Sequence, residues 1–119
     1  MALPHAQALD IIDVRPLGAG LLTAVTHSLL KTPTLQLMRV VLPAGRGLPE
    51  HHVAGAITLQ CLEGEAEVAT PSRQCRLSAG QLVMLDGGEP HTVTALTDTS
   101  LLLTLLLPGH KPPDASESK

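Results

Sequence analysis

The side chains most able to do chemistry gather in a short stretch near the middle of the chain. Glu50, His51 and His52 are consecutive, Cys61 follows nine residues later, and a further histidine stands at position 91. Imidazole, carboxylate and thiolate groups are the usual protein ligands of divalent transition metals. Neutral histidines also form hydrogen bonds inside polar cavities. These residue types therefore indicate either a metal site or a hydrogen-bonded histidine pair, depending on the elements that position them.

Short segments rich in Val, Leu, Ile and Thr recur along the chain with Gly or Pro between them, as in antiparallel sandwiches and barrels. No segment favours a helix, and no repeat or change of composition divides the chain. We expect residues 1–10 to form an N-terminal arm, 11–109 a single all-β domain, and 110–119 a disordered tail with two prolines. The expected strands are Leu21 to His27, Leu35 to Leu42, Ala56 to Leu62, Ala66 to Thr70, Gln74 to Leu77, Leu82 to Leu85, Thr92 to Leu96 and Leu101 to Leu107.

Composition argues against several classes of function. The chain contains no Phe, Tyr or Trp and has a formal net charge of -3, so it offers neither stacking platforms nor a basic field for nucleic acid. Residues 1–10 lack a basic segment followed by an apolar run, so we expect no secretory signal and a cytoplasmic location. The longest apolar run, 101–107, is far shorter than the roughly 20 residues of a membrane helix, so no membrane association is expected. Cys61 and Cys75 are expected to be reduced thiols.

Charged residues outside this stretch are expected to be exposed. Arg39 and Arg46 are assigned to the surface, although at the mouth of a pocket either one would attract an anionic ligand. Glu63 and Glu65 flank a glycine turn and would keep a hairpin soluble.

The spacing of glycines and histidines resembles the first motif of the cupin superfamily. That motif runs Gly, five residues, His, one residue, His, three or four residues, Glu, six residues, Gly. Gly45, His51 and Gly64 keep this spacing, whereas Val53 and Ile57 stand at the second histidine and the glutamate positions.

The second cupin motif runs Gly, five residues, Pro, one residue, Gly, two residues, His, three residues, Asn. Gly80, Gly88 and His91 keep their places, and Asp86 and Ala95 replace the proline and the asparagine. The two motifs cover about 50 residues. The resemblance implies a cupin double-stranded β-helix, also called a jelly-roll barrel, with His51 and His91 facing its lumen. The other three histidines, His5, His27 and His110, match no motif position.

Strand alternation extends the expected lumen beyond the histidines. Successive side chains of a strand point to opposite faces, so residues two apart share one face. In the preferred register Val53, Ile57, Leu59 and Cys61 point inward with His51.

A one-residue slip would change the candidates. If four residues precede Ile57, Glu50 and His52 take the two ligand positions and His51 turns outward, but that register loses the first glycine of the motif. Gln60 faces away from the lumen unless a bulge reverses it. His52, Glu50, Gln60 and Cys61 are therefore second-tier candidates for a metal or pocket site.

Two functional hypotheses follow from the resemblance. Typical cupins hold a divalent metal through three histidines and one glutamate. The resemblance therefore implies that His51 and His91 bind iron, zinc, nickel or manganese, in a metal-dependent oxygenase or isomerase that acts on a small oxygenated substrate. The alternative is a metal-free binding or regulatory module, in which the apolar lumen holds a small molecule and the histidines hydrogen-bond to its polar end. In either case the resemblance implies a homodimer.

Overall fold

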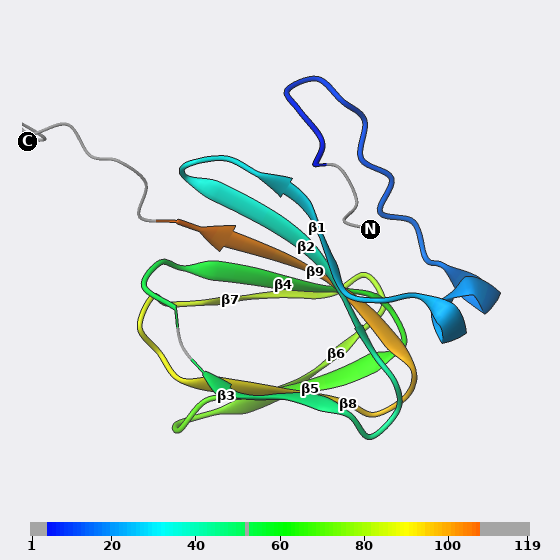
Figure 1. The fold of residues 1–119 in the computed structure, drawn as a ribbon. Coiled ribbons are helices and arrows are strands. Elements are labelled where there is room, and N and C mark those ends of the chain that lie inside the picture. The colour runs from blue at the N-terminus through cyan, green and yellow to red at the C-terminus, as the bar shows by residue number, and fades with distance from the viewer. Residues whose placement is uncertain (1–4, 52, 108–119) are drawn as a thin grey trace, which may run out of the picture.

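The computed structural model describes residues 5–51 and 53–107, without the side chains of Pro49 and His51. In these residues nine strands form two antiparallel sheets that face each other (Figure 1). The larger sheet has the order β1-β2-β9-β4-β7, and the smaller has the order β3-β8-β5-β6. The strands are β1 (His27–Lys31), β2 (Leu35–Leu42), β3 (Gly47–His51), β4 (Ile57–Glu63), β5 (Glu65–Ala69), β6 (Gln74–Ser78), β7 (Leu82–Leu85), β8 (His91–Ala95) and β9 (Thr99–Leu106).

The core lies between the two sheets and is aliphatic. Leu59 on β4 and Leu101 on β9 are 1% and 0% exposed, and Val93 on β8 packs in the same cluster from the opposite sheet. On β4 the buried positions alternate with half-buried ones, as expected for a strand that buries one face more deeply than the other. The predicted all-β class is confirmed, and Cys61 and Cys75 are free thiols, as expected.

One predicted strand, Leu21 to His27, is wrong. Residues Gly18–Thr23 form a short 3-10 helix, η1, and β1 begins only at His27. The segment is rich in strand-forming residues, but β1 is the strand that pairs with the free side of β2, which leaves residues 21–26 outside the ladder. Leu22 and Val25 are accordingly exposed. No helix in the described part of the chain is long or apolar enough to cross a membrane.

β3 is a strand that was not predicted from the sequence. Proline cannot donate to a β-ladder, so Pro49 weakens the strand signal of this segment. β3 lies at the edge of the smaller sheet and pairs only with β8, where a missing amide is tolerated. His52, His110 and the expected C-terminal tail lie outside the described residues.

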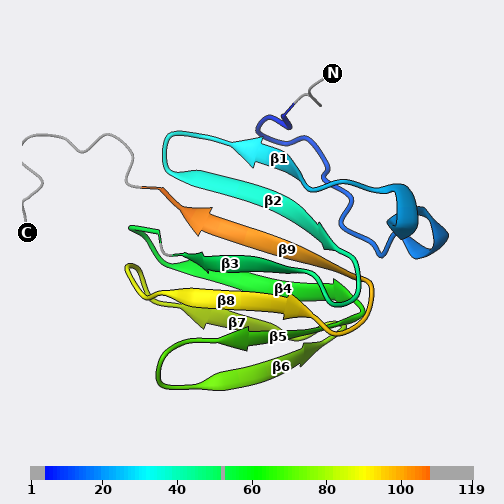
Figure 2. The same ribbon diagram turned by 60° about the horizontal axis from the view of Figure 1, so that its bottom comes forward.

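The connection between β6 and β7 is one of several that cross between the two sheets, and it is hydrogen-bonded to β4. The amide of Gly80 donates to the Cys61 carbonyl at 2.7 Å, and the amide of Cys61 donates to the Gln81 carbonyl at 2.9 Å. The opposite ends of β6 and β7 carry the β5–β6 turn, which lies within the smaller sheet, and the β7–β8 loop, which crosses from the larger sheet to the smaller (Figures 1 and 2).

Candidate functional site

The two motif histidines lie opposite each other on adjacent strands. β3 and β8 are antiparallel, and His51 and His91 are partners in their register. The Cα atoms of directly opposed residues in such a pair are about 4.5–5.5 Å apart. His91 is 3% exposed and shares the buried face of β8 with Val93 and Ala95. The backbone therefore brings both histidine positions to one place in the barrel.

The buried imidazole of His91 is oriented by its own loop. Its Nδ1 lies 3.2 Å from the carbonyl oxygen of Glu89. When Nδ1 carries the proton, it donates to this carbonyl, and Nε2 is then the acceptor nitrogen of the ring.

The other expected lumen positions are apolar and belong to the core. Ile57 and Leu59 are 3% and 1% exposed, and Val53 is half-buried against the same cluster. Cys61 is fully buried, and its Sγ lies 3.4 Å from the Gly64 carbonyl and 3.5 Å from that of Glu63. Burial raises the pKa of the Cys61 thiol, so it stays protonated near neutral pH and is a poor soft ligand.

The second-tier candidates are dispersed. Glu50 is exposed on β3, and Gln60 is half-buried at the position of β4 between the buried Leu59 and Cys61. Gln60 pairs in register with Leu82 and Leu102, without a bulge at that point. Its side chain therefore lies on the outer face of the larger sheet.

A cavity of about 350 Å³ lies between the β5–β6 hairpin and β7. Its apolar wall contains Val68, Val83 and Leu85, and the thiol of Cys75 completes this wall from β6. The remaining lining residues, most of them polar, come from the β5–β6 turn, the first residue of β6, β7 and the loop after β7: Thr70, Ser72, Arg73, Gln74, Met84, Asp86 and Glu89.

The cavity adjoins the histidine pair. Glu89 lines the cavity, and its carbonyl contacts His91. Val68, on the apolar wall, pairs in register with Val93, two residues after His91. Sequence reasoning missed Cys75 and the charged rim. The alternation of Cys75 and Leu77 on β6 was a usable signal for Cys75, whereas nothing in the sequence shows that the β5–β6 turn and the β7–β8 loop border one cavity.

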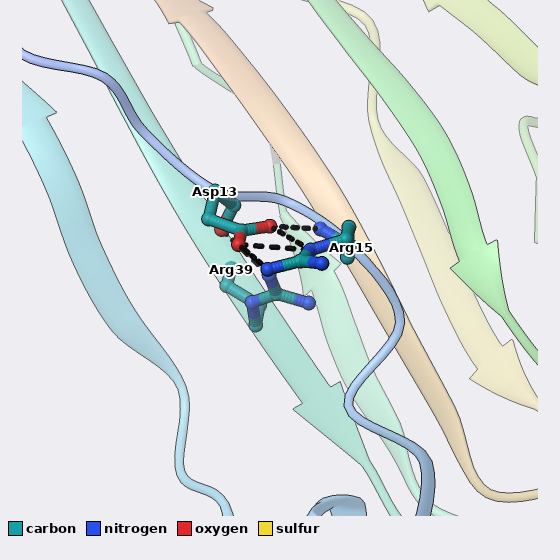
Figure 3. Close-up of polar contacts among 3 residues, drawn as sticks. All are labelled: Asp13, Arg15 and Arg39. Atoms are coloured by element: carbon teal, nitrogen blue, oxygen red, sulfur yellow. Dashed lines mark hydrogen bonds and ion pairs between the residues drawn. The ribbon is translucent and has the colours of Figure 1, made fainter.

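Arg39 is buried, so its predicted surface position is wrong. The side chain is 3% exposed on the outer face of β2, beneath residues 10–18, which we name the N-terminal strap. Arg39 Nη2 donates to the backbone carbonyl of Asp13 at 3.2 Å (Figure 3). The Arg15 guanidinium hydrogen-bonds to the Asp13 carboxylate and lowers the pKa of that carboxyl to about 2. No pattern in the sequence predicts that this segment folds back over β2.

Glu63 holds the same strap. Its carboxylate accepts hydrogen bonds from the amides of Leu17 and Gly18, at 2.8 and 3.0 Å, and from the Ser100 hydroxyl at 2.6 Å. Burial raises the pKa of Glu63, but these three bonds and the charge of Arg39 outweigh it, so the pKa lies below its ordinary value of 4.5. The predicted role as a solubilising hairpin residue therefore misses its main contacts.

We expect Glu63→Gln to loosen the strap. An amide has one acceptor oxygen and no charge, so the variant should lose about 1 kcal/mol of strap attachment. Because the folded pKa is depressed, this stabilisation is present above about pH 4.5 and is lost as the pH falls through the folded value. Hydrogen exchange of the Leu17 and Gly18 amides measures it. Glu65→Gln is the control, since the bond that the Glu65 carboxylate accepts within the described residues is the weaker one from the Ser78 hydroxyl at 3.3 Å. Equal exchange in both variants would contradict the role of Glu63.

Comparison with known proteins identifies the family. A model of the cupin domain matches residues 38–107, more than half of the chain. The chain belongs to the cupin family. No curated protein matches this cupin.

Solved structures similar to this cupin confirm its fold. A cupin superfamily protein from Desulfitobacterium hafniense is 18% identical, with a TM-score of 0.72, over 86% of this chain and 99% of that chain. A conserved protein of unknown function from Streptococcus pyogenes is 19% identical, with a TM-score of 0.71, over 92% and 97%. An RmlC-like cupin with a double-stranded β-helix from Methanocaldococcus jannaschii is 17% identical, with a TM-score of 0.65, over 70% and 79%. At these identities the likeness shows the fold alone.

The donor set of this cupin does not fit a complete three-histidine, one-glutamate metal centre. Val53 and Ile57 occupy two of the four ligand positions, and both pack with the core. Among the described residues, no group of three or more His, Cys, Asp and Glu side chains is placed to hold a metal. A catalytic metal usually has at least three protein ligands. The His51 and His91 positions supply two.

Proposed function

We propose that this cupin binds a small molecule in the cavity between the β5–β6 hairpin and β7. The cavity itself is the main support, since it combines an apolar wall with polar and charged groups at its rim. Its volume of about 350 Å³ lies at the lower end of the range for small-molecule sites. The apolar residues at two metal-ligand positions also favour binding over metal-dependent catalysis.

The histidine pair is the polar end of this site. The Glu89 carbonyl connects His91 with the rim of the cavity. A ligand that extends from the apolar wall toward β8 would approach the imidazole of His91, a side chain that carries nitrogen donors and acceptors.

The proposal predicts that a neutral branched alcohol, 3-methylbutan-1-ol, enters the cavity. In methyl NMR titrations we expect the signals of Val68, Val83 and Leu85 to shift, and those of Leu101 on β9 to stay. Cys75→Leu should weaken binding by about tenfold, because a larger side chain on the apolar wall would occupy ligand volume. Arg76→Leu is the matched control, since Arg76 is the next residue of β6 and is exposed. Cavity signals that do not respond, or a response that Cys75→Leu leaves unchanged, would reject the cavity as a binding site.

The register of β3 and β8 favours a second candidate function, a divalent metal bound through His51 and His91. The two histidine positions are direct cross-strand partners, which suits shared ligation of one ion. Such a metal would be iron, zinc, nickel or manganese, and it would act as a Lewis acid toward an oxygenated substrate.

Elemental analysis tests this second candidate. The metal hypothesis expects near-stoichiometric transition metal in protein purified without chelators, and its loss in a folded His51→Ala, His91→Ala variant. A His5→Ala, His27→Ala variant is the control, because these histidines match no motif position. Protein that stays free of metal after incubation with all four ions would reject the candidate.

A further inference from the structure

The rim of the cavity carries unpaired charges of both signs on its two sides. Arg73 lies in the β5–β6 turn, and Asp86 and Glu89 lie in the β7–β8 loop. In the described part of the chain the one ion pair joins Asp13 and Arg15, on the N-terminal strap. The three rim charges are therefore available to a ligand.

Backbone hydrogen bonds hold both sides of the rim. In the turn, the Thr70 amide donates to the Arg73 carbonyl at 2.7 Å, and the Arg73 amide donates to the Thr70 hydroxyl at 3.2 Å. In the loop, the Gly88 amide donates to the Val53 carbonyl at 2.7 Å. The charged side chains thus extend from two hydrogen-bonded segments, the β5–β6 turn and the β7–β8 loop.

We propose that the ligand of this cavity is a zwitterion with a short aliphatic body, such as an apolar α-amino acid. This inference rests on the proposed binding function and specifies the class of ligand. An α-amino acid would direct its carboxylate toward Arg73 and its ammonium toward Asp86 and Glu89. Val68, Val83 and Leu85 would contact its aliphatic side chain.

Ligands with a single charge fit the rim less well. A carboxylic acid would pair with Arg73 but would face two carboxylates, and an amine would face the guanidinium. An aromatic body would find no aromatic partner, because the chain has no Phe, Tyr or Trp. The volume of about 350 Å³ also favours a small ligand.

Three probes that share one aliphatic body test the inference. They are L-leucine, 4-methylpentanoate, which lacks the amine, and 3-methylbutylamine, which lacks the carboxylate. We expect leucine to bind about fivefold or more tightly than either singly charged probe, with shifts at the Val68, Val83 and Leu85 methyl signals. This difference in affinity between leucine and the singly charged probes is modest, because Arg73 and Asp86 are exposed and solvent screens their charges.

Rim variants assign the two charges. Arg73→Gln should lower the affinity for leucine and for 4-methylpentanoate by about fivefold and should not lower the affinity for 3-methylbutylamine. Asp86→Asn should lower the affinity for leucine and for 3-methylbutylamine and should not lower the affinity for 4-methylpentanoate. Arg76→Gln, outside the cavity, should change none of the three.

The outcomes separate this inference from the proposed function. Equal affinities for the three probes, or rim variants without effect, would reject the zwitterion as the ligand class. Binding of the neutral alcohol would still show that the cavity binds a small molecule. Leucine that does not shift the cavity signals overturns the zwitterion as well. If the neutral alcohol also leaves those signals unchanged, the binding function itself is rejected.

Discussion

A Val53→His, Ile57→Glu variant is expected to bind zinc tightly, because it restores the two missing ligand positions of the first cupin motif. In the metal-free state the variant should be less stable by about 3 kcal/mol or more, since Ile57 is 3% exposed and a carboxylate there is buried without a partner. Zinc at a hundredfold excess over its Kd should restore about 2.7 kcal/mol. Urea unfolding followed by far-ultraviolet circular dichroism, with and without zinc, measures both effects.

The control for this experiment removes one histidine of the pair. A Val53→His, Ile57→Glu, His91→Ala variant carries the same buried carboxylate but lacks the imidazole that lies buried on β8. Zinc should stabilise it far less. Equal stabilisation of the two variants would show that the new side chains bind zinc without His91, and the lumen geometry proposed for the histidine pair would be wrong.

The sequence predicted the fold well because strand alternation and motif spacing are local properties. Seven of the expected segments coincide with strands to within one or two residues, and the only misplaced segment was 21–27. Its composition favours a strand. Which segment pairs with β2 depends on tertiary contacts, however, and in the structure that segment is β1, which begins at His27. β3 was not predicted because it contains Pro49. Proline is excluded from central strands, but an edge strand such as β3 tolerates it.

The site was predicted only in part, because its parts come from different sheets. Motif spacing identified His51 and His91, and the structure pairs their positions in register. The roles of Arg39 and Glu63 depend on a strap that folds back over the outer face, and the cavity rim depends on two loops that meet across the sheets. The metal, the homodimer and the cytoplasmic location stay predictions.

Gly64→Ala is expected to destabilise the protein by about 3 kcal/mol or more, through two separate effects. Gly64 has a φ of 85°, where a side chain costs about 1–2 kcal/mol. A Cβ at this position would also lie 2.2 Å from the Asp98 carbonyl oxygen and 2.6 Å from the Thr99 hydroxyl. That hydroxyl donates to the Glu65 carbonyl at 3.0 Å, so relief of the clash would disturb the β4–β5 turn.

Gly80→Ala separates the two effects, because Gly80 also has a positive φ, of 90°, but a Cβ there would meet no atom within 4 Å. Its cost should be only the same backbone cost of about 1–2 kcal/mol, measured by the same urea unfolding. The difference between the variants then gives the energy of the close approach between the β4–β5 turn and residues 98–99. If both variants lose the same stability, backbone conformation alone explains the motif glycine. A larger loss at Gly64 would show that this turn must pack directly against residues 98–99, where the chain enters β9.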